Sequence, residues 1–144
     1  MKKFYSIISL SLISLSLLYS QQAEDILGLW ANEDSTQIVQ VMKQGNVFVG
    51  KLTNLNSHNS GSLLDLENPE IEKKSSTLIG LDVWIDFEYN EARHNWVDGK
   101  IYNFKNGNSY NGKIQIDGNA LKLTGHYGFF FFLAKTQDWT RVHK

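Results

Sequence analysis

The sequence predicts an all-β domain, either an up-and-down antiparallel barrel or a sandwich, built from eight short strands. Three observations predict this fold class. Apolar and polar residues alternate with period two from residue 26 onward, Gly and Asn residues separate the alternating runs, and no helical period extends over ten residues. The chain has 144 residues and a net charge of -1, which leaves room for one such domain.

The expected strands follow one another at short spacing, over 26–31, 36–43, 47–54, 80–89, 94–103, 108–117, 120–127 and 137–143. Gly and Asn residues predict tight turns at 44–46, 106–107 and 117–119. Asp98-Gly99 predicts a bulge inside a longer strand, and Gly50 a bulge or bend. In strand 80–89, strict alternation leaves Trp84 as the only apolar residue on the exposed face.

One long loop, residues 54–77, interrupts the succession of hairpins. Loops of this length are usually functional lids or disordered. Asn68 as N-cap and Pro69 at the first helical position predict a short helical turn within the loop. Four apolar side chains are expected to press that turn onto the domain: Leu63, Leu64, Leu66 and Ile71.

Residues 1–20 are typical of a cleaved signal peptide. Lys2 and Lys3 precede an apolar, serine-containing run over 4–18, and the small residue Ser20 precedes a plausible cut. We therefore expect a barrel domain over 21–144 in the periplasm or secreted, with 12 basic and 15 acidic side chains and a net charge of -3. No transmembrane segment is expected in it, and the absence of cysteine excludes disulfides.

Composition and motifs argue against several function classes. The acidic balance and the lack of a large Lys/Arg cluster disfavour nucleic-acid binding. Gly45-x-x-x-x-Gly50-Lys51 resembles a phosphate-binding loop, but Leu52 cannot bind magnesium and the segment is a predicted strand. We expect no cofactor.

No catalytic or metal site is expected either. The histidines His58, His94, His126 and His143 have no metal-ligand spacing, although His58, near Asp65, is hardest to dismiss. Asp65, Glu67 and Asn68 lack the remaining elements of a calcium loop. The alternating acids Asp82, Asp86 and Glu88 most simply face water, where catalysis is poor. The sequence predicts a protein that is not an enzyme.

Several motifs together resemble one bacterial family. Gly28-Leu29-Trp30 matches the Gly-x-Trp start of lipocalin-like barrels, and it is followed in order by Gly50-Lys51-Leu52, Asp65-x-x-Asn68-Pro69, Gly80-Leu81, Trp96-x-x-Gly99-Lys100-Ile101-Tyr102, Asn106-Gly107-x-x-Tyr110, Leu121-x-Leu123-x-Gly125-x-Tyr127 and Thr136-Gln137-x-Trp139-Thr140-Arg141. Over about 26–142 the chain resembles the domain of unknown function 2147, a lipocalin-like group of exported proteins.

The resemblance implies an eight-stranded antiparallel up-and-down barrel of the calycin type, an envelope location and no established activity. It also implies that Trp30 closes one end of the barrel, with Arg141 stacked across it. Two features depart from the family pattern: Phe104 stands where a proline is usual, and Phe129–Phe132 replaces a more varied loop.

Aromatic residues are the remaining candidates for a binding site. If the barrel is hollow, its lumen or rim would be lined by Phe48, Phe87, Tyr89, Trp96, Tyr102, Tyr110, Tyr127 and Phe130. The favoured interpretation is that a small, largely apolar ligand binds inside, gated by 54–77 and the rim Phe129–Phe132. Ordinary core packing explains the same aromatics in a filled barrel, whose rim would then dock an envelope protein or a membrane surface.

Overall fold

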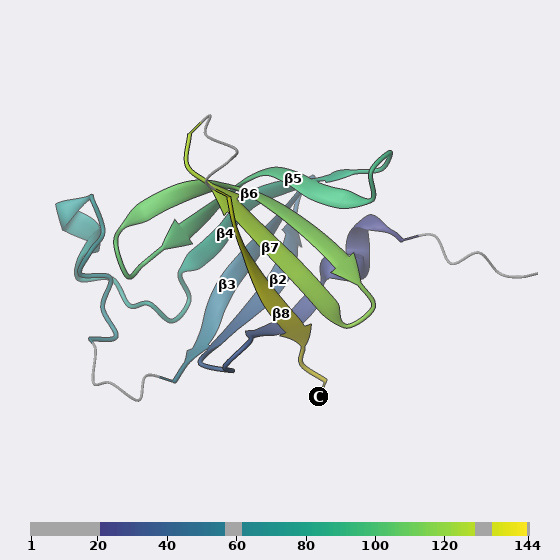
Figure 1. Cartoon of the computed structure of the whole chain (residues 1–144). Coiled ribbons are helices and arrows are strands. Elements are labelled where there is room, and N and C mark those ends of the chain that lie inside the picture. Colours follow the sequence, from purple (N-terminus) through teal and green to yellow (C-terminus); the bar gives the residue numbers. More distant parts are fainter. Residues whose placement is uncertain (1–20, 57–61, 129–133, 144) are drawn as a thin grey trace, which may run out of the picture.

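A closed barrel of eight antiparallel strands forms the body of the protein (Figure 1). The computed structural model describes residues 21–56, 62–128 and 134–143. Each strand pairs with the next along the chain, and the last pairs with the first, so the predicted up-and-down barrel is confirmed and the sandwich is excluded. The strands are β1 (Gly28–Asn32), β2 (Gln37–Gln44), β3 (Val47–Leu55), β4 (Asp82–Asn90), β5 (Asn95–Asn103), β6 (Asn108–Asp117), β7 (Ala120–His126) and β8 (Lys135–Arg141).

Strand β5 contains the bulge that Asp98-Gly99 predicts. Asp98 has a φ of 59°, and the pairing of β5 with β6 shifts register between Trp96 and Gly99. A Cβ atom at Gly99 would lie 2.4 Å from the ring of Phe87, and one at Gly112 would lie 2.5 Å from the same ring. The two glycines therefore give Phe87 the space to cross the barrel interior.

Strand β4 departs from the expected alternation at Trp84. Trp84 is only 2% exposed, so its predicted place on the wet face is wrong. Phe48 of β3 pairs with Phe87 and Gly50 pairs with Trp84, which leaves one residue more on β4 than on β3 between these pairs. This irregularity, with Asp86 at a φ of 54°, turns both Trp84 and Phe87 inward. A bulge or bend was predicted at Gly50, and the pairing of β3 with β4 shifts register on both sides of Gly50.

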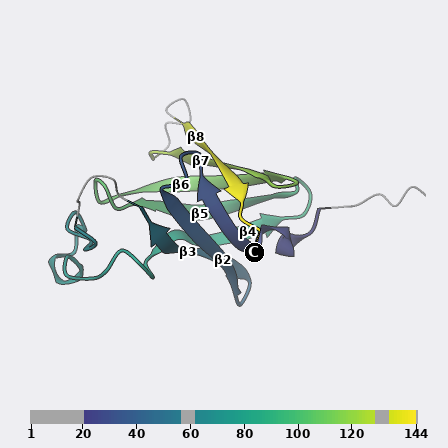
Figure 2. The same ribbon diagram turned by 90° about the horizontal axis from the view of Figure 1, so that it is seen from below.

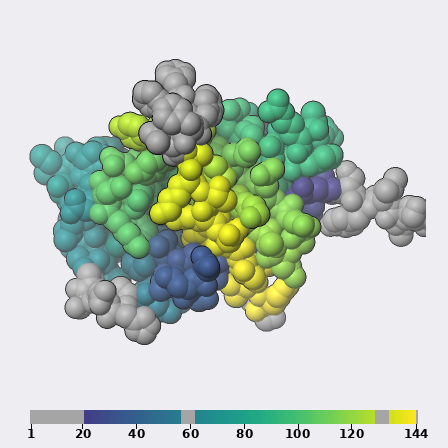
Figure 3. All heavy atoms as spheres, in the orientation of Figure 1, coloured from purple at the N-terminus to yellow at the C-terminus, as the bar shows by residue number. Residues whose placement is uncertain are grey.

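The two ends of the barrel differ. The closed end carries the 3-10 turn η1 (Ala23–Ile26) and the β2–β3, β4–β5 and β6–β7 turns. The open end carries the β1–β2 and β5–β6 turns and the β3–β4 and β7–β8 connections. In Figures 1 and 2, η1 lies at the right and the β3–β4 connection at the left. The space-filling view places the same connection (teal) and η1 (purple) at opposite ends of the surface (Figure 3).

The β3–β4 connection corrects two expectations. Its helical turn is the single 3-10 turn η2 (Ile71–Lys73), which starts after Glu70 and not after Asn68. The Asn68 side chain accepts a hydrogen bond from the Glu70 N–H, two residues further on, and so closes a turn ahead of η2. The four apolar side chains that were expected to press it onto the barrel are exposed, and Ile71 is 82% exposed. Leu63, Leu64 and Leu66 are also exposed, because the buried Leu78 and Asp65 attach the connection instead. Neither η1 nor η2 is a helix that could cross a membrane, and the described ranges hold no other candidate.

Candidate functional site

The closed end is sealed by Trp30 and Arg141. Trp30 is fully buried and donates its indole N–H to the Ile26 carbonyl at 2.8 Å. The Arg141 guanidinium lies 4.2 Å from the centroid of the Trp30 ring and donates to the carbonyls of Leu27 and Asp25 at 2.9 and 2.6 Å. One side chain of the last strand thus stacks on the first strand and satisfies two carbonyls of the preceding segment.

Four of the predicted lumen aromatics fill the closed half of the barrel. Phe48, Phe87 and Trp96 are buried, and the Trp96 ring contacts Phe48 and Tyr89 with centroids 6.5 and 5.0 Å apart. Trp96 and Tyr89 also hold the N-terminal segment through hydrogen bonds of 3.2 and 2.8 Å to the carbonyls of Ala23 and Gln21. These side chains pack against one another as part of the core, and burial raises the pKa of the Tyr89 hydroxyl.

A cavity of about 510 Å³ occupies the open half. Its apolar lining consists of Val83, Trp84, Ile101, Phe104, Leu123 and Trp139, together with the aromatic faces of Tyr102 and Tyr110. Its polar lining consists of Gln37, Asn103, Lys105, Asn106, Lys135 and Gln137. Gly125 completes the wall. Trp84 and Trp139 meet edge to face, with ring centroids 4.9 Å apart.

The other predicted lining residues have three different locations. Tyr102 and Tyr110 line the cavity. Tyr127 is 59% exposed and lies outside the lining, although its ring contacts Tyr110 at 5.9 Å between centroids. Phe130, with the rest of Phe129–Phe132, lies outside the described residues. The predicted set therefore mixes core, cavity wall and surface.

Several lining residues were missed by sequence reasoning. Trp84 was missed because the β4 bulge changes the face on which it lies. Gln137 was missed because it is polar, and Lys135 because the predicted last strand began at residue 137, whereas β8 begins at Lys135; both have the same parity in β8 as the buried Trp139. Because residues two apart lie on the same face of a strand, counting back from Trp139 along the strand could have placed these two residues on the inner face.

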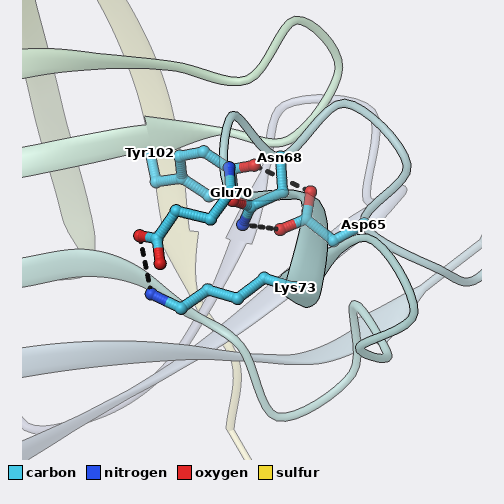
Figure 4. Close-up of polar contacts among 5 residues, drawn as sticks. All are labelled: Asp65, Asn68, Glu70, Lys73 and Tyr102. Atoms are coloured by element: carbon cyan, nitrogen blue, oxygen red, sulfur yellow. Dashed lines mark hydrogen bonds and ion pairs between the residues drawn. The ribbon is translucent and has the colours of Figure 1, made fainter.

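A buried carboxylate fastens the β3–β4 connection to the wall of the cavity (Figure 4). Asp65 is fully buried and accepts hydrogen bonds from the Tyr102 hydroxyl and the Asn68 amide, both at 2.7 Å. Burial, and then the hydrogen bond to Asp65, raise the pKa of Tyr102 above its usual value. The motif Asp65-x-x-Asn68-Pro69 is therefore an anchor in this structure.

The same anchor contacts the β5–β6 turn. Gly107 has a φ of 73°, and a Cβ atom there would lie 2.0 Å from the Glu67 carbonyl oxygen. Only glycine fits this position without a shift of the backbone. An ion pair of 2.8 Å joins Lys73 to Glu70 on the outer side of the connection (Figure 4).

None of the other described chemical candidates is among the residues that line the cavity. His94 contacts the Tyr89 hydroxyl at 3.1 Å near the closed end, and His58 lies outside the described residues. Asp82 pairs with Lys51 at 2.5 Å. Within 21–56, 62–128 and 134–143, no group of acidic or histidine side chains is arranged to hold a metal ion. The segment that resembles a phosphate-binding loop is β3 and its turn.

Comparisons with known proteins agree with this architecture. A family model described as "Uncharacterized protein conserved in bacteria (DUF2147)" matches residues 28–141. No curated protein matches the chain. Among solved structures, the chain is similar to protein HP1028 from the human pathogen Helicobacter pylori, which belongs to the lipocalin family; the TM-score is 0.72, the identity 18%, and the alignment covers 83% of this chain and 84% of that one.

At that identity the likeness to HP1028 concerns the fold alone, an eight-stranded lipocalin-like barrel. The family match spans the whole barrel, since it runs from the first residue of β1 to the last residue of β8. The chain therefore belongs to the bacterial DUF2147 family.

Proposed function

We propose that this protein is an exported lipocalin-like carrier or sensor that binds one small, largely apolar molecule in the open half of its barrel. The cavity of about 510 Å³ is the observation on which the proposal depends. Pockets for small molecules commonly measure about 300–1,000 Å³. Because the closed half is filled by Trp96, Phe87 and Phe48, the ligand would occupy the open half alone.

The floor of the cavity favours apolar contact. Trp84, Trp139, Val83 and Leu123 are all buried and offer aromatic and aliphatic surface. Each apolar Å² removed from water contributes about 25 cal/mol, so a ligand that itself buries roughly 150 Å² of apolar surface on this floor gains about 4 kcal/mol before the cost of association. An apolar molecular body is therefore the part of the ligand that the floor would recognise.

We infer binding in preference to catalysis. No histidine, aspartate or glutamate is among the described residues that line the cavity. General acid–base catalysis most often uses a histidine or a carboxyl group within hydrogen-bond reach of the reacting atoms. The buried carboxylate of Asp65 already accepts two hydrogen bonds, and it lies behind Tyr102.

Export remains part of the proposal on sequence grounds. Residues 1–20 lie outside the described residues, and their pattern of Lys2, Lys3 and an apolar run supports a cleaved leader. Fractionation of cells that express the full chain, followed by intact-mass measurement, tests it. We expect a processed chain that begins near Gln21 in the exported fraction, and an unprocessed cytoplasmic chain would contradict export.

Ligand binding is tested directly on purified protein. Mass spectrometry of a denatured extract should release a small molecule, and titration with the neutral fluorophore N-phenyl-1-naphthylamine should saturate at one site. If the extract is empty and the fluorophore does not bind, the proposal fails.

A second candidate function has one observation in its favour. Leu63, Leu66, Ile71 and Ile79 are exposed on the β3–β4 connection at the open end, and apolar side chains gathered on a surface can mark an interface. The proposal is that this surface docks an envelope partner. Cross-linking in intact cells, compared between the wild type and Ile71→Ser, tests it; equal cross-linking in the two proteins would contradict it.

A further inference from the structure

Lys135 occupies an inward position at the mouth of the cavity. It shares its face of β8 with Gln137 and the buried Trp139, and all three line the cavity. The alternate residues face outward, as the ion pair of 3.2 Å between Asp138 and Lys122 shows. Lys135 pairs in register with Gly125 of β7, which has no side chain to cover it.

A second lysine lies at the same mouth. Lys105, in the β5–β6 turn, also lines the cavity, and no acidic residue in the described ranges does so. The pKa of the Asp34 carboxyl group is lowered, mainly by hydrogen bonds from Thr36 and to a smaller extent by the positive charge of Lys105. Lys135 has no ion pair with any described residue. The lining is thus cationic in a chain whose net charge is -1.

The wall below the lysines supplies a further donor. The indole N–H of Trp139 is buried and has no hydrogen-bond partner within the described chain. Tyr102, by contrast, already donates to Asp65, and Tyr110 accepts from Asn106 at 3.1 Å. Beside the neutral amides of Gln37 and Gln137, which carry both donors and acceptors, the wall therefore presents one buried donor and two lysine ammonium groups, which complement an anionic, acceptor-rich head group.

We propose that the ligand is an anionic amphiphile, whose apolar body lies on Trp84 and Trp139 and whose single carboxylate, sulfonate or phosphate head contacts Lys135, with Lys105 as the second cation. This inference rests on the proposed binding function and adds the ligand's charge and orientation. The head at the mouth keeps part of its hydration, while the body is desolvated on the floor.

Two fluorophores with the same body test the proposal. 8-Anilinonaphthalene-1-sulfonate carries one sulfonate, and N-phenyl-1-naphthylamine is the same ring system without it. In Lys135→Gln we expect the dissociation constant of the sulfonate to rise about five-fold, since a partly exposed ion pair contributes about 1 kcal/mol, and that of the neutral probe to stay within about two-fold.

The matched control is Lys113→Gln. Lys113 lies on β6 between the buried Gly112 and Ile114, so it faces outward, and the substitution removes the same charge from the surface. Binding of the sulfonate to this variant should equal wild-type binding. Raising the ionic strength from about 0.05 to about 0.5 M should weaken sulfonate binding to the wild type more than to Lys135→Gln.

The outcomes separate the two proposals. If the neutral probe binds but Lys135→Gln and Lys113→Gln affect the sulfonate equally, the anionic head is contradicted and apolar binding survives. If neither probe binds the wild type, both proposals fail. Binding of the neutral probe to Lys135→Gln, together with an unchanged circular dichroism spectrum, shows that the variant is folded.

Discussion

Replacing Tyr102 with Phe tests how the β3–β4 connection is held at the open end. The substitution removes one hydroxyl, which donates to the fully buried Asp65 at 2.7 Å. A hydrogen bond to a charged group contributes about 1.5–3 kcal/mol, and a buried acceptor that loses its donor costs a similar amount. Because Asp65 keeps the hydrogen bond from Asn68, we expect the free energy of unfolding to fall by about 2 kcal/mol.

Urea unfolding followed by tryptophan fluorescence measures this change, and Tyr110→Phe is the matched control. The Tyr110 hydroxyl only accepts from the exposed Asn106, so its loss should cost less than about 0.5 kcal/mol. Amide exchange should accelerate at Asp65 and Leu78, whose N–H groups donate to the carbonyls of Ser76 and Leu63 within the connection. Equal stability losses in the two variants, with unchanged exchange, would refute the anchor.

Three further predictions concern the anchor and the closed end. Gly107→Ala should destabilise by more than about 2 kcal/mol because its Cβ would collide with the Glu67 carbonyl, whereas Gly118→Ala, with a φ of 58° and open space, should cost about 1 kcal/mol; equal midpoints in thermal unfolding would contradict this. Arg141→Met should cost about 2–4 kcal/mol in urea unfolding, since it removes the stacking and two hydrogen bonds, and a loss under about 1 kcal/mol would show that the closure is dispensable. Because the folded-state pKa of Tyr102 is raised above the ordinary value of 10.0, its contribution is complete below pH 10 and decreases at higher pH, so unfolding free energy measured at alkaline pH should fall more in the wild type than in Tyr102→Phe.

The strand order and most strand bounds could be predicted because alternation and turn residues are local signals. Strand 108–117 was predicted with the bounds that the structure has, and the Asp98-Gly99 bulge was predicted from its two residues. The face of Trp84 could not be predicted, because a bulge elsewhere in β4 reverses the parity of every position on one side of it. The leader over 1–20 stays a prediction.

The candidate site was harder to predict, because the aromatic residues expected to line the lumen lie in three different places: the core, the cavity wall and the surface. Trp96 and Phe87 fill the closed half because Gly99 and Gly112 admit the Phe87 ring, a long-range fit that no single segment encodes. The position of Tyr102 near the lumen could be predicted from its strand. Its hydrogen bond to Asp65 could not, because the two residues lie 37 positions apart in the sequence. Lys135 was not considered, because the predicted last strand began two residues later, at 137, and because only aromatic residues were selected for the lumen.

The central claim is that one small molecule binds in the open half of the barrel, and filling that space tests it most directly. Gly125→Leu places a side chain in the cavity wall, where the nearest atom to its Cβ is the mobile end of Ile101 at 3.3 Å. The control Thr124→Leu adds the same side chain on the outer face, next to Thr136.

Titration with N-phenyl-1-naphthylamine should then give one site per chain in the wild type and Thr124→Leu. Folded Gly125→Leu should bind at least about tenfold more weakly, a loss of about 1.4 kcal/mol. Wild-type affinity in Gly125→Leu would contradict the account, because the probe would then be bound outside the cavity.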